Sequence, residues 1–280
     1  MKLRSLLFVP GARPDRMAKA LLAGADALIL DLEDSVASSA KADARWHVAS
    51  FLEKHEAAHV WVRINPLDAA EADRDLAAVL PHHPKGIVLP KAEGGASVAE
   101  LARRLTERGN ATASILAIAP ETPAAIFQLG SYGGSKRLAG LTWGAEDLPA
   151  AIGATTSREP GGSYTPPYEL ARSLCLFGAA AAGVAPIETV YPAFRDRDGL
   201  GTYAARARRD GFTGMMAIHP DQVPVINAAF TPSPAEVAHA RAVVAAFDAH
   251  PGAGTLSLDG RMIDRPHLIQ AQRVLAAAEG

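Results

Sequence analysis

The chain has 280 residues, 49% of them hydrophobic and 21% charged, and a formal net charge of −2 at pH 7. This composition is typical of a globular protein, and the near-neutral charge gives no electrostatic basis for binding nucleic acid or an acidic membrane surface. No run of about 18 apolar residues indicates a membrane span, and the single Cys175 excludes an internal disulfide and a cysteine-rich metal site, which indicates a cytoplasmic protein.

Short apolar runs alternate with longer segments of helical periodicity. The first run is too short for the core of a signal peptide, so it predicts a first strand. Eight strands are expected, at residues 6–10, 27–33, 60–65, 86–91, 115–120, 138–144, 185–191 and 215–220. Helices are expected at residues 14–23, 38–57, 69–80, 97–108, 123–129, 167–183, 199–209 and 221–229. Pro14 and Pro123 suit a first helical turn, and Ser97 suits an N-cap.

Eight such units with strands that are mostly apolar throughout fit a parallel sheet covered by helices. We therefore predict an α/β fold, a (β/α)8 TIM barrel over residues 1–230, although a doubly wound sheet has a similar rhythm. Residues 153–167 are rich in Gly, Pro, Ser and Thr and predict a long loop of the kind that often forms a lid. Residues 231–280 predict a C-terminal extension of a helix capped by Ser233, a hairpin-like piece and a last helix.

Polar residues stand at the ends of most of the predicted strands. Since the carboxyl ends of barrel strands meet on one face, these side chains are expected to gather there. In chain order they are Asp31, Glu33, Asp34, Arg63, Asn65, Lys91, Glu121, Glu146, Asp147, Glu188, Tyr191 and His219. Any one of them is as readily a helix cap or a surface charge. Their repetition in most units favours a functional site.

Glu121 and Asp147 follow neighbouring strands. Two carboxylates, completed by waters and a substrate oxygen, are the usual protein share of a Mg²⁺ site, and no His or Cys cluster indicates zinc. Glu121 precedes Thr-Pro, so a simple capping role is the alternative. Gly144 and Ala145 are small enough for their backbone N–H groups to approach a ligand carboxylate.

The stretch "LILDLEDSV" ends a predicted strand with three carboxylates, Asp31, Glu33 and Asp34. These acids either surround a metal through bound water or pair with Arg63 or Lys91, because an unpaired buried cluster is too costly. Arg63 stands in an otherwise apolar strand. Its fork of donors suits a substrate carboxylate, and an internal salt bridge with Asp31 or Glu33 is compatible with that role.

Together these residues carry a recognisable pattern. The matching stretches are "RSLLFVPGARPDRM", "LILDLEDSV" followed by "KADAR", "VRIN", "LPKAE", "ETP", "WGAEDL", "ETVYPAFRDRDGL", "AIHPDQV" and "DGRMIDRP", from residue 4 to about residue 266. The chain resembles the citrate lyase β-subunit-like proteins of the HpcH/HpaI aldolase superfamily. The resemblance implies a Mg²⁺-dependent lyase acting on 3-hydroxyacyl thioesters such as malyl-, citramalyl- or citryl-CoA, usually assembled as a trimer or hexamer.

The resemblance also implies roles for single residues. Glu121 and Asp147 look like the metal ligands, and Arg63 looks like the clamp on the substrate carboxylate and carbonyl. Asp31, Glu33 and Asp34 look like catalytic acids that surround the metal through its bound water. Arg13 and Lys19 lie where relatives hold the CoA nucleotide, and Asp264 matches the acid that relatives insert into a neighbouring subunit's site. Two positions depart from the pattern and bear on substrate specificity. Relatives often have Lys where this chain has Met215, and Asp where this chain has Glu188.

The implied chemistry is a retro-Claisen cleavage that releases a keto acid (glyoxylate, pyruvate or oxaloacetate) and a thioester enolate, with Asp264 as the candidate acid that protonates the enolate. Lys91 as an imine-forming residue is the alternative, and it would duplicate the electrophilic work of the metal. Three other functions stay open: a CoA-independent aldolase of hydroxy-keto acids, a non-catalytic barrel that binds CoA or an organic acid, and a subunit of a citrate lyase complex that uses an acyl-carrier-protein thioester.

Overall fold

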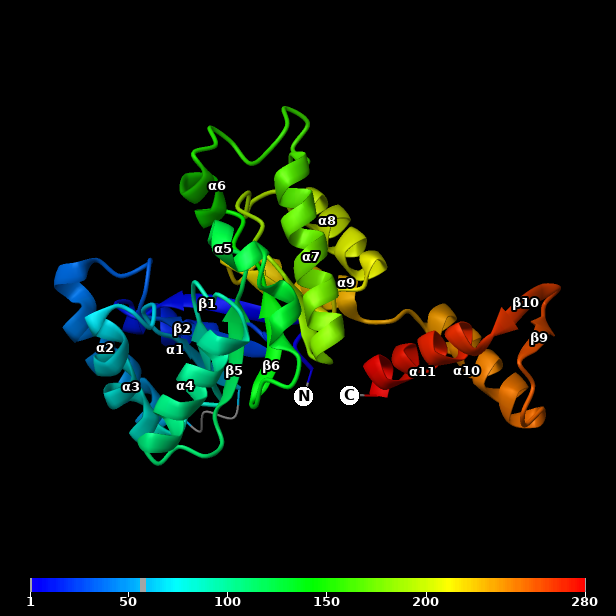
Figure 1. The fold of residues 1–280 in the computed structure, drawn as a ribbon, viewed down its shortest axis with the longest axis horizontal. Coiled ribbons are helices and arrows are strands. Elements are labelled where there is room, and N and C mark those ends of the chain that lie inside the picture. Colours follow the sequence, from blue (N-terminus) through cyan, green and yellow to red (C-terminus); the bar gives the residue numbers. More distant parts are fainter. Residues whose placement is uncertain (1, 56–58, 280) are drawn as a thin grey trace. The chain divides into compact units, whose positions relative to one another are not determined.

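The structure is a computed structural model that describes residues 2–55 and 59–279. Eight parallel strands close into a barrel in chain order, with helices around them (Figure 1). The strands are β1 Ser5–Pro10, β2 Ala27–Asp31, β3 Val60–Arg63, β4 Gly86–Leu89, β5 Ser114–Ile118, β6 Leu138–Thr142, β7 Ala185–Glu188 and β8 Gly214–Ala217. The predicted barrel is confirmed, because β1 pairs with β8 as well as with β2 and no open sheet remains among these described strands.

β1 ends at Pro10 as predicted, and the other seven strands end two or three residues earlier than predicted. β2 ends at Asp31 because its carboxylate accepts hydrogen bonds from the backbone N–H groups of Glu33 at 2.9 Å and Ser35 at 3.1 Å. Such an Asp turn draws the backbone away from the ladder. Most of the predicted site residues therefore lie in the loops just beyond the strands, or at their last position.

The helices around the barrel are α1 Pro14–Ala20, α2 Lys41–Lys54, α3 Ala70–Val79, α4 Gly95–Glu107, α5 Pro123–Ile126, α6 Asp147–Ile152, α7 Pro166–Ala182, α8 Arg197–Asp210 and α9 Gln222–Phe230, with 3₁₀ turns at Ser38–Ala40, Leu80–His82 and Leu129–Tyr132 (η3). The predicted N-cap at Ser97 is wrong: α4 begins at Gly95, and the Ser97 hydroxyl accepts a hydrogen bond from the Glu93 N–H instead. Residues 56 and 57 of the predicted helix 38–57 lie outside the described residues.

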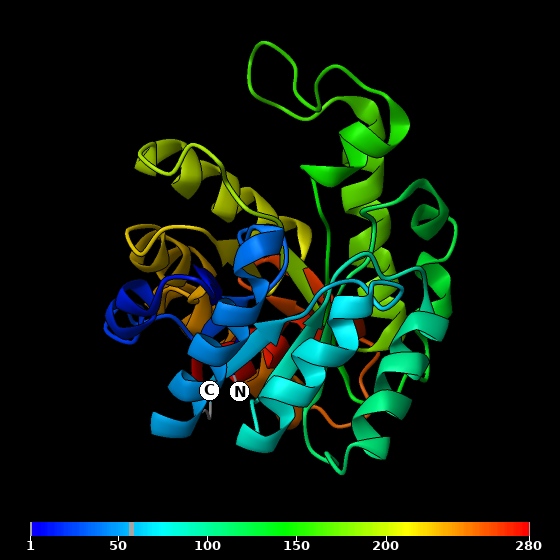
Figure 2. The same cartoon turned by 90° about the vertical axis from the view of Figure 1, so that its left-hand side faces the viewer.

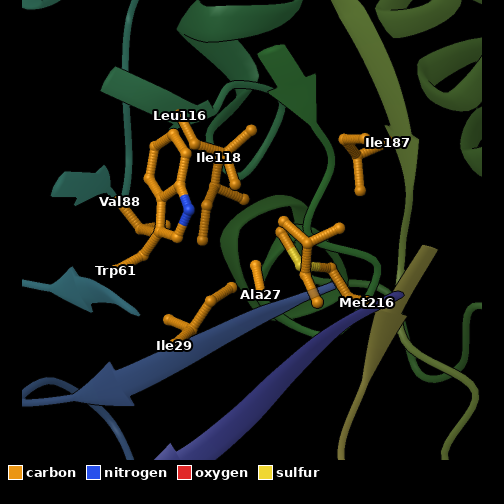
Figure 3. Close-up of a cluster of buried hydrophobic side chains, with 9 residues drawn as sticks. Ala27, Ile29, Trp61, Val88, Leu116, Ile118, Ile187 and Met216 are labelled. Atoms are coloured by element: carbon orange, nitrogen blue, oxygen red, sulfur yellow. The ribbon is translucent and has the colours of Figure 1, made fainter. Parts of the chain in front are cut away.

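A cluster of apolar side chains fills the barrel interior (Figure 3). Trp61 is the largest of them, and it packs over Gly86 of the next strand, where a Cβ atom would lie 2.3 Å from the indole ring. A larger residue at position 86 would overlap the indole ring of Trp61, so the packing of the barrel interior requires glycine there. Ile118 and Met216 belong to this cluster and also face the cavity above it. The packed interior closes the floor of that cavity.

The chain divides into two compact units, Leu3–Asn227 and Ala228–Gly280 with Met1–Lys2. The second contains α10 Pro234–Ala249, the antiparallel pair β9 Thr255–Leu258 and β10 Arg261–Asp264, and α11 Arg265–Glu279. The cap at Ser233 is confirmed and forms a capping box with Glu236. In the barrel unit, the loop between α6 and α7 projects beyond the neighbouring helices (Figure 2). No described helix is long and apolar enough to cross a membrane.

Candidate active site

A cavity of about 160 Å³ lies at the carboxyl end of the barrel. Residues that follow several different strands form its walls. The charged and hydroxyl-bearing lining residues are Asp34, Arg63, Glu121, Thr142, Glu146, Asp147 and Thr189. The remaining lining residues are Phe8, Ile118, Trp143, Gly144, Ala145, Val190 and Met216. The structure thus brings together predicted site residues that are up to 113 positions apart in the chain, from Asp34 to Asp147.

Arg63 is the positive partner of the acidic strand end. Its Nε and Nη2 donate to Asp31 at 2.6 and 2.7 Å, and its Nη1 lies 3.0 Å from Glu33 and 3.7 Å from Asp34. Burial by itself raises the pKa of Asp31, but the hydrogen bonds and charge of Arg63 outweigh it and hold that pKa below its usual range. The guanidinium also lies 4.8 Å from the Phe8 ring centroid, in the cavity wall.

Lys91 joins two of the acids. Its Nζ lies 2.9 Å from Glu33 and 3.2 Å from Asp147. Burial lowers the pKa of the Lys91 amine, but the hydrogen bond and charge of Glu33 outweigh that effect and raise it. An imine-forming lysine needs a lowered pKa, so this environment does not favour the Schiff-base alternative. At Glu33 the opposite balance holds. Burial raises the pKa of its carboxyl group by more than the positive charges of Arg63 and Lys91 lower it, so this pKa is raised.

Lys41 is a positioning residue that the strand-end pattern did not single out. From the start of α2, its Nζ donates to the backbone carbonyls of Leu32 and Glu33, both at 2.9 Å, and to Asn65 Oδ1 at 2.7 Å. Asn65 in turn donates to Leu32 O and to Asp75. This network fixes the backbone that carries Glu33. The sequence motif "KADAR" could have indicated this role, because its lysine, Lys41, closely follows the acidic stretch that ends β2.

Glu121 is almost fully buried, and its Oε2 accepts a hydrogen bond from the Lys91 backbone N–H at 2.6 Å. Burial raises its pKa to about 8, and the nearby negative charges of Asp147 and Glu33 add to the rise. Lys91 also holds a left-handed backbone (φ 49°), which is uncommon for a residue other than glycine. A carboxylate in such surroundings is stabilised by a cation beside it.

Gly144 leaves the space that the Glu121 carboxyl group occupies. A Cβ atom at position 144 would lie 2.6 Å from Glu121 Oε1. Among the described residues, no group of three or more His, Cys, Asp or Glu side chains is arranged to hold a metal. Glu121 and Asp147 instead offer two carboxylates on one cavity, which fits a Mg²⁺ ion that keeps its other positions for water and substrate oxygens.

Three other predicted residues belong to the first helix and its preceding loop, and to the second compact unit. Arg13 is exposed and pairs with Asp15 at 2.9 Å, and Lys19 is exposed on α1; neither lines the cavity. Asp264 ends β10 in the second unit. Its Oδ1 accepts a hydrogen bond from the His267 N–H at 3.4 Å and lies 2.6 Å from His267 Nδ1, so it occupies a cap position at the start of α11.

A buried network behind the cavity was not foreseen. Glu188 Oε1 accepts from Trp143 Nε1 at 2.6 Å and from the Thr189 N–H at 2.9 Å, and its Oε2 accepts from Arg172 Nε at 2.6 Å. Trp143 and Thr189 both line the cavity, so Glu188 helps to place its wall. Met215, the other position that departs from the family pattern, is fully buried and does not line the cavity.

The loop between α6 and α7 is attached to the same wall. The buried Tyr164 ring lies edge-on to Trp143 at a centroid distance of 5.0 Å. Arg158 stacks over Tyr164 at 4.0 Å and donates to its hydroxyl oxygen at 2.7 Å. Any rearrangement of this loop therefore affects the cavity wall through Trp143.

Comparison with known proteins gives consistent results. A family model, HpcH/HpaI aldolase/citrate lyase, matches residues 4–220. The chain is 32% identical to a (3S)-malyl-CoA thioesterase of Cereibacter sphaeroides, over 99% of this chain and 94% of that protein. It is 37% identical to a citrate lyase subunit beta-like protein of Mycobacterium tuberculosis (97% and 94%) and 31% identical to the mitochondrial citramalyl-CoA lyase of Rattus norvegicus (98% and 86%). A crystal structure of CitE from M. tuberculosis in complex with magnesium, acetoacetate and coenzyme A is 34% identical, with a TM-score of 0.85 over 99% of this chain and 98% of CitE.

Proposed function

The chain belongs to the HpcH/HpaI aldolase/citrate lyase family, and we propose that it is a Mg²⁺-dependent carbon–carbon lyase of 3-hydroxyacyl-CoA thioesters. It cleaves a thioester such as malyl-, citramalyl- or citryl-CoA into a 2-oxo acid and acetyl-CoA. The observation that carries this proposal is the buried Glu121 beside Asp147, in the same cavity as Arg63. Relatives named as citramalyl-CoA lyase and citrate lyase subunit beta support it.

The reaction is a retro-Claisen cleavage. A general base accepts the proton of the substrate hydroxyl, the bond between the hydroxyl-bearing carbon and the thioester α-carbon breaks, and a 2-oxo acid and a thioester enolate result. Protonation of the enolate carbon then gives acetyl-CoA. Mg²⁺, held by Glu121 and Asp147, supplies Lewis-acid stabilisation of the negative charge that develops on oxygen.

Arg63 binds the substrate carboxylate and the oxygen that becomes the carbonyl. Its fork is fixed by Asp31 and Glu33 before substrate arrives, so little reorganisation is needed. The backbone N–H groups of Gly144 and Ala145 bind the same carboxylate from the β6 side. Lys91 and Lys41 hold Glu33 and its loop in place.

Asp264 donates the proton that the enolate receives, and it acts in the site of a neighbouring subunit in a homotrimer or hexamer. Arg13 and Lys19, both exposed at the first βα loop and helix, contact the CoA nucleotide. Exposed cations suit a phosphate-bearing ligand that stays partly in solvent.

A second candidate function is hydrolysis of a malyl-CoA thioester, which the Cereibacter relative's name favours. Hydrolysis yields the hydroxy acid and free CoA, whereas cleavage of the carbon–carbon bond yields the 2-oxo acid and acetyl-CoA. The remaining alternatives are an aldolase that works without CoA and a lyase subunit that uses an acyl-carrier-protein thioester.

One assay separates these functions. Malyl-CoA, citramalyl-CoA and citryl-CoA are incubated with the purified protein in Mg²⁺ and in EDTA, and the 2-oxo acid, acetyl-CoA and free thiol are measured separately. We expect 2-oxo acid and acetyl-CoA in equal amounts, only with Mg²⁺. Free thiol without 2-oxo acid would establish the thioesterase instead, and full activity in EDTA would exclude the metal-dependent lyase.

A further inference from the structure

Asp264 and His267 contact each other in both directions at the start of α11. Asp264 Oδ1 lies 2.6 Å from His267 Nδ1 and accepts a hydrogen bond from the His267 N–H at 3.4 Å, and the Asp264 N–H donates to His267 Nδ1 at 3.2 Å. These contacts have the pattern of a capping box in which histidine occupies the third helical position, where glutamate or glutamine is usual. A cap needs only an acceptor at that position. Histidine also brings a ring that can exchange a proton near neutral pH.

The proton that Asp264 donates in the proposed reaction needs a source. The hydrogen bond from His267 lowers the pKa of the Asp264 carboxyl group. An aspartate whose pKa lies below its ordinary value is ionised near neutral pH and has no proton to give. His267 Nδ1 is 2.6 Å from Oδ1, which is within the distance over which a proton passes directly between two groups. The carboxylate therefore stands next to a group from which it can take the proton it lacks.

The imidazole ring of His267 is open to water. Its side chain is 49% exposed, whereas that of Asp264 is 32% exposed. His267 also lines a groove of about 300 Å³ between α10 and α11, together with Glu236 and His239 of α10. Water can therefore return a proton to the ring after each transfer.

We propose that His267 acts through Asp264 as a positioning residue that holds and returns the proton of its carboxyl group, so that the Asp264–His267 pair serves as the acid. This inference rests on the proposed lyase function, in which Asp264 protonates the enolate.

Each proton transfer in this scheme is balanced. In the cleavage direction, Nδ1 passes its proton to Oδ1, and the electron pair of the N–H bond stays on nitrogen. The enolate carbon then takes that proton from the carboxyl group, and the electron pair of the O–H bond stays on oxygen. The ring recovers a proton from solvent, which has received the one released by the substrate hydroxyl. In the synthesis direction a proton of the acetyl methyl group passes to Asp264 and on to His267.

His267→Gln tests this role, because glutamine keeps the cap and cannot supply a proton. The intact oligomer is incubated in heavy water with acetyl-CoA, Mg²⁺ and pyruvate, and deuterium uptake into the acetyl methyl group is followed by mass spectrometry. In parallel, kcat and KM are measured for cleavage of malyl-CoA, citramalyl-CoA and citryl-CoA. We expect deuterium uptake and kcat to fall roughly tenfold or more, with KM and the melting temperature close to those of the wild type. His239→Gln, the same change in the same groove, is the matched control and should alter neither rate.

His267→Ala gives a second readout. Added imidazole should restore part of its deuterium uptake, because free imidazole can pass a proton to Asp264 but cannot rebuild the cap, and it should restore none in Asp264→Asn. Wild-type rates in His267→Gln, or no recovery of folded His267→Ala with imidazole, would overturn the inference and leave the lyase function intact. A wild type that neither cleaves any of the three thioesters nor exchanges methyl hydrogens would defeat the proposed function, and the inference with it.

Discussion

Gly144 packs against the carboxyl group of Glu121 so closely that a Cβ atom at position 144 would lie 2.4 Å from Glu121 Cγ. Glu121 cannot easily move aside, because it is buried and its Oε2 accepts the Lys91 N–H. Glycine at this position is therefore a condition for the orientation of the proposed metal ligand. The sequence motif "WGAED" had indicated a different use for Gly144, the approach of its N–H group to substrate, and the two uses are compatible.

Gly144→Ala should weaken Mg²⁺ binding by roughly tenfold or more, because the added methyl group forces Glu121 from its place or breaks its hydrogen bond. Isothermal titration calorimetry with Mg²⁺ measures the affinity, and circular dichroism checks the fold. Gly161→Ala is the control, since Gly161 has open space around its Cβ direction and no positive φ. Unchanged Mg²⁺ affinity in Gly144→Ala would show that Glu121 is not a ligand in this orientation.

Glu121→Gln and Asp147→Asn should each abolish measurable Mg²⁺ binding and reduce turnover by roughly a thousandfold. Both changes keep the shape of the side chain, and the amide oxygen introduced by Glu121→Gln can still accept the Lys91 N–H, so the fold should persist. Glu146→Gln is the control: Glu146 adjoins Asp147 and lines the same cavity, but it is exposed. A variant of either proposed ligand that retains wild-type Mg²⁺ affinity would exclude it from the metal site.

Arg63→Lys should reduce kcat/KM by roughly a hundredfold, because a single ammonium cannot hold Asp31 through two hydrogen bonds and still face Glu33 and the substrate. Arg4→Lys is a matched control. Arg4 holds Asp26 through the same two-pronged contact, with Nε at 2.8 Å and Nη2 at 2.7 Å, but it lies just before the start of β1, whereas Arg63 is the last residue of β3. If the two variants lose stability alike and Arg63→Lys keeps its kinetics, Arg63 is only a structural partner of Asp31.

Arg172→Met should lower the free energy of unfolding by about 3–5 kcal/mol, because it leaves the Glu188 carboxylate buried without its cationic partner. The double variant Arg172→Met/Glu188→Gln should recover much of that loss, because no buried charge then remains. Urea unfolding of the wild type, both single variants and the double variant gives the coupling. Additive losses would mean that the two side chains stabilise the fold independently.

The barrel could be predicted from the sequence because each strand is a short apolar run between helical segments, and the order of the runs requires parallel pairing. The ends of the strands after β1 were predicted two or three residues too late, because local hydrogen bonds decide where a strand ends. At Asp31 the side chain ends the strand by accepting two backbone N–H groups, and no apolar pattern reports that.

The polar part of the cavity was also accessible from sequence, since residues at the ends of parallel strands must meet. Its apolar lining was not, because Ile118 and Met216 look like ordinary strand residues and their position above the barrel interior appears only in three dimensions. The link between Glu188 and Arg172 joins a strand to a helix across 16 residues, and neither sequence neighbourhood indicates the other.

Asp264→Asn separates a structural role of this residue from a chemical one. In the structure Asp264 caps α11 through the His267 N–H, and asparagine caps a helix about as well as aspartate. The variant should therefore melt close to the wild type, whereas the loss of a proton donor should cut turnover by roughly a hundredfold or more. Equal loss of stability and activity would instead point to the cap alone.

Mixed oligomers then show where Asp264 acts. Inactive Asp264→Asn subunits are combined with inactive Glu121→Ala subunits, and the mixed species are isolated by two different affinity tags. If Asp264 serves a neighbouring subunit, some sites receive an intact Glu121 from one chain and an intact Asp264 from another, so partial activity returns. Mixing two differently tagged preparations of Asp264→Asn is the control and should restore none. Verified mixed oligomers without any recovered activity would mean that Asp264 serves the barrel of its own chain or no site at all.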